Sequence, residues 1–268
     1  QPNAMGGREV GGLANQLAAH MELDNPQHRD TVARFWQVDS VADKQGLKAV
    51  DLFDAIDDGK VKAVWIMATN PVVSMPDADK VKRALDKCEL VVVSDCIENT
   101  DTTACADVLL PATGWAEKDG TVTNSERRMS RQRQFMLAAG EAKPDWWMIC
   151  EIAKRMGYEE SFSYKNAADI FREHAALSGF DNNNNRDFDV SAMAGIEDKD
   201  YNNMAPIQWP VKVNSITGQA RLFGDGDFYT PSRRARFIAV TPMAPANLAS
   251  AEYPLILNTG RLRDQWHT

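Results

Sequence analysis

VKAVWIMATNP, residues 61–71, is one of three apolar runs that set the class of this fold, together with ELVVVSD at 89–95 and DVLLPA at 107–112. Short runs rich in Val, Ile and Leu are typical of strands buried on both faces of a parallel sheet. Between the first two runs, DADKVKRALDKC at 77–88 has the apolar spacing of an amphipathic helix. This order predicts an α/β fold with a parallel sheet and right-handed crossovers.

Apolar spacing also predicts helices before and after the sheet region. They cover residues 13–23, 28–37, 51–60, 142–158 and 165–177, and Gly59 stops the third of them. The fourth begins at Pro144 and Asp145, and its expected apolar face consists of Trp147, Ile149 or Cys150, Ile152 and Met156.

Residues 195–250 carry few helix signals. Within them, 221–228 and 234–240 are typical of short strands or hairpin arms around the turn at 224–226. A further strand is expected at 254–258. The fold class is therefore α/β: a parallel-sheet, Rossmann-like nucleotide-binding domain with helices, followed by an irregular segment.

Composition excludes several classes of protein. The chain has 268 residues, a net charge of −8 and 44% hydrophobic residues, which is a globular balance. No apolar run approaches the roughly 18 residues of a membrane-spanning helix, so no membrane partner is expected. The acidic balance argues against nucleic-acid binding, because phosphates reward clustered Lys and Arg.

Cysteines and histidines predict no metal site within this chain. The four cysteines, Cys88, Cys96, Cys105 and Cys150, form no C-x-x-C pair. We expect Cys88, Cys96 and Cys150 to be buried in the fold, and the protein to reside in a reducing compartment. The four histidines do not cluster in the sequence. We expect His20 and His174 to lie in helices, facing solvent or satisfied locally.

Polar side chains stand where the predicted strands end. Asn70 follows the first strand, Ser94 and Asp95 end the second, and Thr100 precedes the third. Ligands of parallel sheets bind at the carboxyl ends of the strands. An aspartate there accepts hydrogen bonds from a ribose diol or a guanine edge, whereas the alternative is a set of helix caps and turn residues. No G-x-G-x-x-G or Walker motif is present.

A basic run follows the sheet region and leaves two alternatives open. Arg127, Arg128, Arg131 and Arg133 form either a solvated strand edge or a surface that faces an anionic cofactor or substrate.

Four stretches resemble the molybdopterin oxidoreductases, most closely the catalytic subunit of assimilatory nitrate reductases. They are QPNAMGGREVGG, WIMATNPVVSMPDADKV, VVVSDCIENTDTTACADVLLPATGWAEKDGTVTNSERR and LILNTGRLRDQWHT. The resemblance covers most of the chain and is weakest over about 160–215. It implies a bis-molybdopterin guanine dinucleotide cofactor with molybdenum.

The resemblance assigns site residues one by one. Asn70, Ser94 and Asp95 match positions that contact the guanosine diphosphate arm, and Lys118 and Asp145 match further cofactor contacts. Gln1 and Arg8 match the substrate funnel above the metal, where an arginine attracts nitrate. The closing loop matches a segment that wraps pterin and pyrophosphate; its residues are Thr259, Gly260, Arg261, Leu262, Arg263, Asp264, Gln265, Trp266, His267 and Thr268.

The resemblance also implies parts that this chain lacks. The cysteines for a [4Fe–4S] cluster and the cysteine that ligates molybdenum are absent, and both ends look cut, so we expect an internal fragment. The expected parts are an α/β molybdopterin guanine dinucleotide-binding region at 1–180, an irregular connecting segment with short strands at 181–250, and the start of a truncated β-barrel domain at 251–268.

The implied activity of the full-length protein is reduction of nitrate to nitrite in the cytoplasm. The electron donor would be a ferredoxin, a flavodoxin or an NADH-linked subunit. The alternatives are another molybdopterin oxidoreductase, such as a periplasmic nitrate reductase or a formate dehydrogenase, and a non-catalytic nucleotide-binding module.

We predict that the isolated 268-residue chain does not reduce nitrate, because the cysteines for the metal and the cluster are not in it. Nitrite formation by the purified chain with reduced viologen is the measurement, and turnover above the level of a buffer blank would contradict this prediction.

Overall fold

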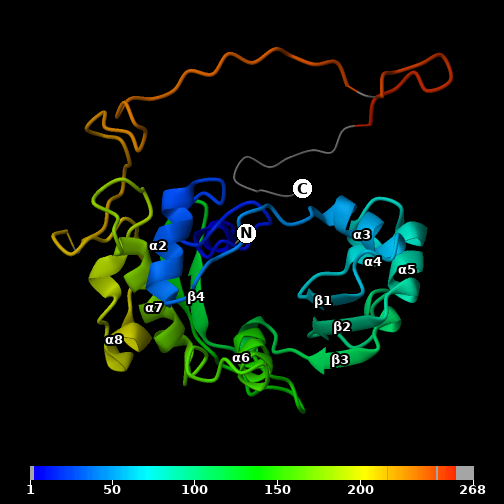
Figure 1. Cartoon of the computed structure of the whole chain (residues 1–268), viewed down its shortest axis with the longest axis horizontal. Helices are drawn as coiled ribbons and strands as arrows, with labels where there is room; N and C mark the ends of the chain where they lie inside the picture. Colours follow the sequence, from blue (N-terminus) through cyan, green and yellow to red (C-terminus); the bar gives the residue numbers. More distant parts are fainter. Residues whose placement is uncertain (1–2, 216, 246, 258–268) are drawn as a thin grey trace.

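The computed structural model describes residues 3–215, 217–245 and 247–257. The helices and strands gather in two lobes, one on each side of Figure 1. The parallel-sheet lobe comprises residues 49–111, and the helix-rich lobe comprises 3–36, 120–132 and 167–211. Helix α6 (Asp145–Arg155) lies between them at the base of the view. Each lobe has its own apolar core.

The predicted parallel sheet is confirmed. Strands β1 (Ala63–Met67), β2 (Leu90–Asp95) and β3 (Val108–Pro111) pair in the order β1-β2-β3, and both pairs are parallel. Met67 pairs with Ser94 and Asp95 pairs with Pro111, so the carboxyl ends of the strands share one edge.

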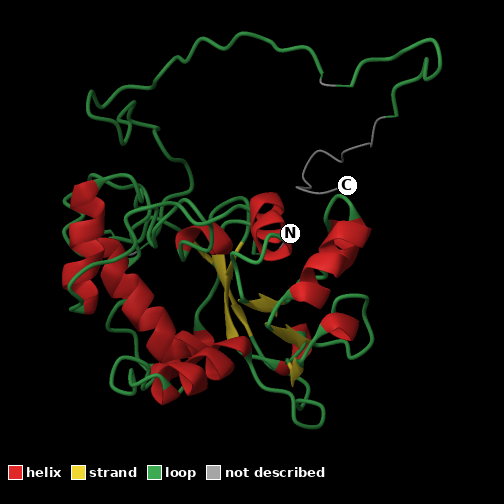
Figure 2. Cartoon of the chain, turned by 45° about the vertical axis from the view of Figure 1, so that its right-hand side comes forward, coloured by secondary structure: helices red, strands yellow, loops and turns green. Residues whose placement is uncertain are grey.

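Helices cover one face of this sheet, as the side-on view in Figure 2 shows. They are α3 (Ala49–Asp57), α4 (Pro71–Ser74) and α5 (Ala78–Lys87). The predicted inward residues of α5, Val81 and Leu85, are each 2% exposed and pack with Phe53, Ile66 and Val93.

The expectation of strands buried on both faces is wrong in part. On β2, Val91 and Val93 are fully buried, but Leu90 at the strand start is exposed, and so are Val108 and Leu109 of β3. A single layer of helices explains this, because it shields only one face of the sheet. The apolar run therefore identifies the strands but overstates their burial.

The helix-rich lobe is built on two capped helices. In α2 (Pro26–Trp36), the side chain of Asn25 accepts hydrogen bonds from the first turn, and in α7 (Ala167–Gly179) Asn166 does the same. Both helices, and α3, confirm the sequence prediction. The remaining elements of this lobe and its links are α1 (Gly6–Glu9), α8 (Asp198–Asn203), β4 (Gly120–Thr123), β5 (Arg128–Gln132), β6 (Ile207–Gln208), and the 3-10 turns η2 (Trp115–Glu117) and η3 (Ser191–Met193). A further 3-10 turn, η1 (Thr103–Cys105), precedes β3 in the parallel-sheet lobe.

The expected helix at 13–23 does not form. Ala19 and His20 have φ angles of 56° and 58°, in the left-handed region that an α-helix excludes. The amide of Leu17 donates to the carbonyl of Met21, and the segment turns back on itself. Its apolar spacing arises because Leu17 and Met21 both meet the core of the lobe, not because they share a helical face.

The apolar face of α6 is also different from the expected one. Of the two alternatives Ile149 and Cys150, Cys150 is buried as expected, together with Met148 and Ala153. The other expected residues, Trp147, Ile152 and Met156, are exposed, and so is Ile149. Cys150 and Ala153 are three positions apart and Met148 is two positions before Cys150, so the buried side of the helix differs from the expected one. The period predicts a helix; only the packing decides which side turns inward.

The expected strands in the C-terminal part are wrong over the described residues. Residues 221–228 form turns, 234–240 form extended coil, and no strand occupies 254–257. Phe237 is 99% exposed and Leu257 is 97% exposed, so no neighbouring strand covers them. This segment arches away from both lobes in Figure 1. Residues 258–268 lie outside the described residues, so the barrel start stays a prediction.

Within the described ranges, no helix is long and apolar enough to cross a membrane.

We predict that Leu85→Ala lowers the free energy of unfolding by about 3 kcal/mol, because it leaves a cavity in the core of the parallel-sheet lobe. Chemical denaturation with far-ultraviolet circular dichroism measures this loss. Val73→Ala, at an exposed apolar residue of the same lobe, is the matched control and should change stability by less than about 0.5 kcal/mol. Equal losses in the two variants would contradict the assigned core.

Candidate functional site at the carboxyl edge of the sheet

The residues predicted at the strand ends do lie along one edge of the parallel sheet. Asn70 stands at the N-cap position of α4, shortly after β1, and its Oδ1 accepts a hydrogen bond from Thr102 Oγ1 at 2.6 Å. Ser94 and Asp95 end β2. Thr100 and Thr103 hydrogen-bond to each other in the following turn. The structure thus brings these predicted residues together at the carboxyl edge of the sheet.

Most of these polar atoms already have partners. Ser94 is fully buried, and its Oγ accepts a hydrogen bond from Trp65 Nε1 at 2.7 Å. Oδ1 of Asp95 accepts from the amide of Ile97 at 3.0 Å in a local turn. Oδ2 of Asp95 has no hydrogen-bond partner among the described residues. The turn interpretation therefore holds for Oδ1 of Asp95, whose other carboxylate oxygen stays available. Asn70 stands at the N-cap position of α4 but bonds to Thr102. Ser94 is a buried strand residue that bonds to Trp65.

Lys118 and Asp145 lie at the same edge and contact each other. The Nζ of Lys118 is 3.0 Å from Oδ2 of Asp145, and both side chains are partly buried. The edge is continuous because the amide of Lys143 donates to the carbonyl of Pro111, the last residue of β3. The other oxygen of Asp145, Oδ1, is buried without a hydrogen-bond partner, as is Oγ1 of Thr113. A buried carboxylate oxygen is normally hydrogen-bonded, so a ligand that donates an N–H group to it would explain why Asp145 Oδ1 has no partner in the described part of the chain.

The basic run does not form either of the two expected surfaces. Arg131 is buried, and its guanidinium donates to the carbonyls of Gly120, Gln132 and Tyr201. Arg133 donates to the carbonyls of Asn202 and Met204. These arginines satisfy backbone oxygens of the chain itself, so they hold segments together and do not face a ligand.

Arg127 and Arg128 complete that correction. The Arg127 guanidinium donates to the carbonyls of Trp209, Gln219 and Ala220 and lies 5.2 Å from the centre of the Trp209 ring. Arg128 is half-buried and donates to Oε1 of Gln208 at 3.4 Å. Two of the four side chains, Arg127 and Arg133, thus bond mainly to backbone carbonyls from residues 202–220.

A second group of polar residues, missed by the sequence reasoning, lies in the helix-rich lobe. Glu9 is 4% exposed; its Oε2 accepts from Thr123 Oγ1 at 2.8 Å and its Oε1 accepts from Trp209 Nε1 at 2.5 Å. Burial raises the pKa of the Glu9 carboxyl, although both hydrogen bonds act in the opposite direction. No sequence signal marks a glutamate as buried, because burial here depends on residues 114 and 200 positions away.

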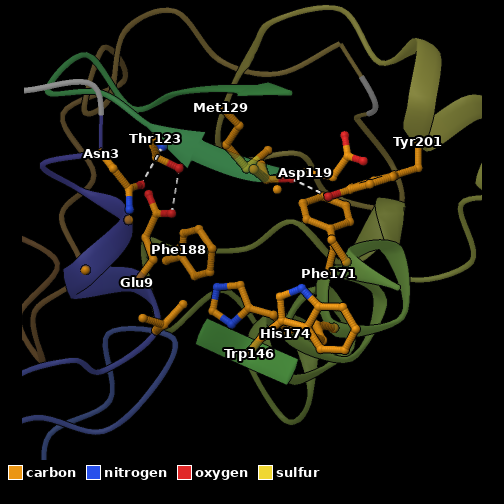
Figure 3. A pocket seen from close by; sticks show the side chains of 17 residues that line it. Asn3, Glu9, Asp119, Thr123, Met129, Trp146, Phe171, His174, Phe188 and Tyr201 are labelled. Atoms are coloured by element: carbon orange, nitrogen blue, oxygen red, sulfur yellow. Dashed lines mark hydrogen bonds between the residues drawn. The ribbon is translucent and has the colours of Figure 1, made fainter. Parts of the chain in front are cut away.

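Glu9 also lines a cavity of about 260 Å³, shown in Figure 3. Apolar and aromatic side chains form most of its wall, including Trp146, Phe171 and Phe188, and His174 reaches it from α7. Nε2 of His174 is buried without a partner. Burial lowers the pKa of His174 to about 4, and the nearby His20 adds to the shift.

His20 does not lie in a helix or face solvent as expected. Its Nδ1 is 2.9 Å from Oδ1 of Asp187, and its ring packs against Phe188 and Trp209. The pKa of Asp187 is lowered: burial is the largest single cause and raises it, but the hydrogen bond to His20, the charge of His20 and two backbone hydrogen bonds together outweigh burial. The prediction for His174 is right about the helix, but the ring nitrogen Nε2 points inward.

Several other predicted residues have different environments. Arg8 is exposed, while Gln1 and the loop 259–268 lie outside the described residues. Cys150 is buried as expected and Cys88 is half-buried, but Cys96 is exposed, because β2 ends before it. In the described ranges, no group of three or more His, Cys, Asp or Glu side chains is placed to hold a metal ion.

The sequence matches the family model "Molybdopterin oxidoreductase" over residues 3–155, which is more than half of the chain. The chain belongs to the molybdopterin oxidoreductase family.

Individual relatives add detail. The chain is 49% identical over its whole length to a nitrate reductase of Shewanella frigidimarina, of which it covers 29%. It is 33% identical to the assimilatory nitrate reductase catalytic subunit of Bacillus subtilis and 33% identical to the F420-dependent formate dehydrogenase subunit alpha of Methanocaldococcus jannaschii, covering 37% of each. It therefore spans about a third of the length of these relatives.

The fold is similar to that of a solved structure, the acetylene hydratase from Pelobacter acetylenicus. The TM-score is 0.52 at 24% sequence identity, and the match covers 85% of this chain and 28% of the other. At this identity the match supports the arrangement of the elements and says nothing about the reaction.

We predict that His174 makes the chain less stable as the pH falls from 6.5 to 4. Its pKa in the folded chain is about 4, below the ordinary value of 6.5, so the unfolded chain binds more protons in this range and the free energy of unfolding decreases. The loss is on the order of 3 kcal/mol at most.

Urea unfolding of the wild type and His174→Phe at pH 7.5 and pH 5 measures this effect. The variant should be less sensitive to pH, because phenylalanine cannot titrate and still stacks on Phe188. The pH 7.5 measurement is the internal control, since histidine is neutral there in both states. An unchanged pH dependence in the variant would exclude His174 as the titrating group.

Proposed function

We propose that this chain is part of the catalytic subunit of an assimilatory nitrate reductase and that it binds one guanosine end of a bis-molybdopterin guanine dinucleotide. The choice of nitrate reduction as the reaction rests on a difference in sequence identity. The chain is 49% identical to a nitrate reductase along its whole length, against 33% to a formate dehydrogenase subunit. The reaction would convert nitrate, two protons and two electrons into nitrite and water.

The carboxyl edge of the sheet supports the cofactor assignment. Asp95 Oδ2 is an acceptor without a partner in the described part of the chain, and Asp145 Oδ1 is a buried one. The N–H groups of guanine and the hydroxyl groups of ribose are the donors that such carboxylates bind. Lys118 would place a positive charge near a phosphate oxygen. The donor and acceptor set at this edge therefore fits the guanosine diphosphate arm.

The other predicted residues would act around this arm. Asn70 and Thr100 would contact phosphate or ribose oxygens from the loops after β1 and β2, and buried Ser94 would hold Trp65 beneath them. The loop 259–268 would wrap the pterin and pyrophosphate. When bound, the molybdenum cofactor would supply the site at which oxygen leaves nitrate.

Substrate capture would fall to exposed Arg8, and Gln1 would be a second residue of the substrate funnel. A guanidinium presents its N–H groups as a planar fork that matches two oxygens of an oxyanion. We also propose a cytoplasmic location, a [4Fe–4S] cluster held outside these residues, and a ferredoxin, a flavodoxin or an NADH-linked subunit as electron donor. Residues 251–268 would begin the β-barrel domain.

We predict that Asp95→Ala in the full-length protein reduces the affinity for the guanosine arm by about tenfold, since it removes a charge-assisted hydrogen bond. Molybdenum and released guanine nucleotide per protein, measured after dialysis, report cofactor retention. Asp107→Ala is the matched control, an aspartate at the opposite edge of the same sheet.

Equal cofactor retention in Asp95→Ala and the wild type would contradict the guanosine assignment. The reaction is tested separately: the full-length protein should form nitrite from nitrate with reduced viologen and should not oxidise formate. Oxidation of formate without nitrate turnover would favour the formate dehydrogenase alternative, and the absence of both with guanine-nucleotide binding retained would favour a non-catalytic module.

A further inference from the structure

Two neighbouring charged residues of α1 have opposite surroundings. Arg8 is exposed, whereas Glu9 is buried and points into the cavity of the helix-rich lobe (Figure 3). Successive residues of an α-helix are separated by about 100° around its axis. In a helix of four residues, the direction of one side chain therefore depends on how its neighbour is held.

Thr123, the last residue of β4, holds this helix through three of its atoms. Its hydroxyl donates to Glu9 Oε2 at 2.8 Å, and its amide donates to Asn3 Oδ1 at 3.0 Å. Its carbonyl accepts from the amide of Met5 at 3.1 Å. A single residue thus fixes the entry and the exit of α1, and Figure 3 shows the two side-chain contacts as dashed lines.

Trp209 holds Glu9 from the other side. Its Nε1 donates to Glu9 Oε1, and its ring is fully buried. The guanidinium of Arg127 lies over that ring and donates to the Trp209 carbonyl, and the amide of Trp209 donates to the Arg127 carbonyl at 3.1 Å. The tryptophan therefore cannot rotate away from the carboxyl group without breaking several contacts.

The local backbone is adapted to the same contacts. A Cβ on Gly6 would lie 1.9 Å from Asn3 Oδ1, the atom that accepts from Thr123, so only glycine leaves room for this hydrogen bond. Burying a carboxyl group costs free energy that an apolar residue of similar size would not cost. Such a group is expected where geometry matters more than stability.

We infer that Glu9, Thr123 and Trp209 form a latch that aims the Arg8 guanidinium at nitrate, which makes Glu9 a positioning residue. The inference rests on the proposed function, since it assigns Arg8 the role of binding the substrate. A forked pair of hydrogen bonds to an oxyanion requires a defined guanidinium direction. Loosening α1 would therefore weaken substrate binding more than it slows the reaction of bound substrate.

Steady-state kinetics of the full-length enzyme with reduced viologen test the latch. Glu9→Ala should raise KM for nitrate by about tenfold and change kcat by less than about twofold. Thr123→Val, which removes one hydroxyl and folds more safely, should raise KM by about threefold. Glu9→Gln should stay near the wild-type KM, because its amide can accept from Trp209 and donate to the Thr123 hydroxyl.

A double variant separates positioning from general damage. If Glu9 acts through Arg8, KM of Arg8→Ala/Glu9→Ala should equal that of Arg8→Ala alone. Asp189→Asn is the matched control: Asp189 is a buried carboxylate of the same lobe, bonded to Ser191 and Asn182, and it should leave KM unchanged. A further rise of KM in the double variant, or an equal rise in the control, would overturn the inference.

Hydrogen exchange of the same proteins gives a readout without turnover. The amides of residues 5–10 should exchange about tenfold faster in Glu9→Ala and remain protected in Asp189→Asn. If Arg8→Ala raises KM while Glu9→Ala changes neither exchange nor KM, the latch is refuted and the proposed function stands. If exchange accelerates but Arg8→Ala leaves KM unchanged, the role of Arg8 in nitrate binding is wrong, and the positioning inference fails with it.

Discussion

The buried carboxyl group of Glu9 joins three segments that lie far apart in the chain. Through Thr123 it ties the N-terminal turn to β4, and through Trp209 it ties both to the segment after β6. A buried carboxyl group is stable only when donors surround it, so these three segments must assemble together. The core formed by Phe188, Trp209 and the helix α7 packs around this polar contact.

The parallel-sheet lobe follows a different principle. Its framework is local: strand, helix and strand alternate, and the core of Phe53, Ile66 and Leu85 comes from residues 53–93. The loops at its carboxyl edge are closed by short-range hydrogen bonds such as those of Thr100 with Thr103. Asp95 and Asp145 each keep a carboxylate oxygen without a partner among the described residues, at an edge where parallel sheets bind ligands.

Prediction from the sequence succeeded where the signal is local. The strands β1 to β3 and the helices α2, α3, α5 and α7 were predicted, because apolar period, capping residues and breakers act within one or two turns. Asn70, Ser94, Asp95 and Thr100 could be placed at the carboxyl edge for the same reason, since each stands at or shortly after the end of a strand. The predictions of a helix at 13–23 and of strands in the C-terminal part were wrong, because the spacing of their apolar residues does not arise from a regular helix or strand.

The amino-acid sequence by itself determined the strand and helix order, the parallel sheet and the placement of polar residues at its carboxyl edge. Only the tertiary structure decided that Glu9 is buried, that His20 pairs with Asp187, and that the arginines of 127–133 bond to the chain's own carbonyls. The physical reason is distance along the chain. A backbone conformation depends on near neighbours, whereas the partner of a long charged side chain is whichever donor or acceptor the fold brings within about 3 Å.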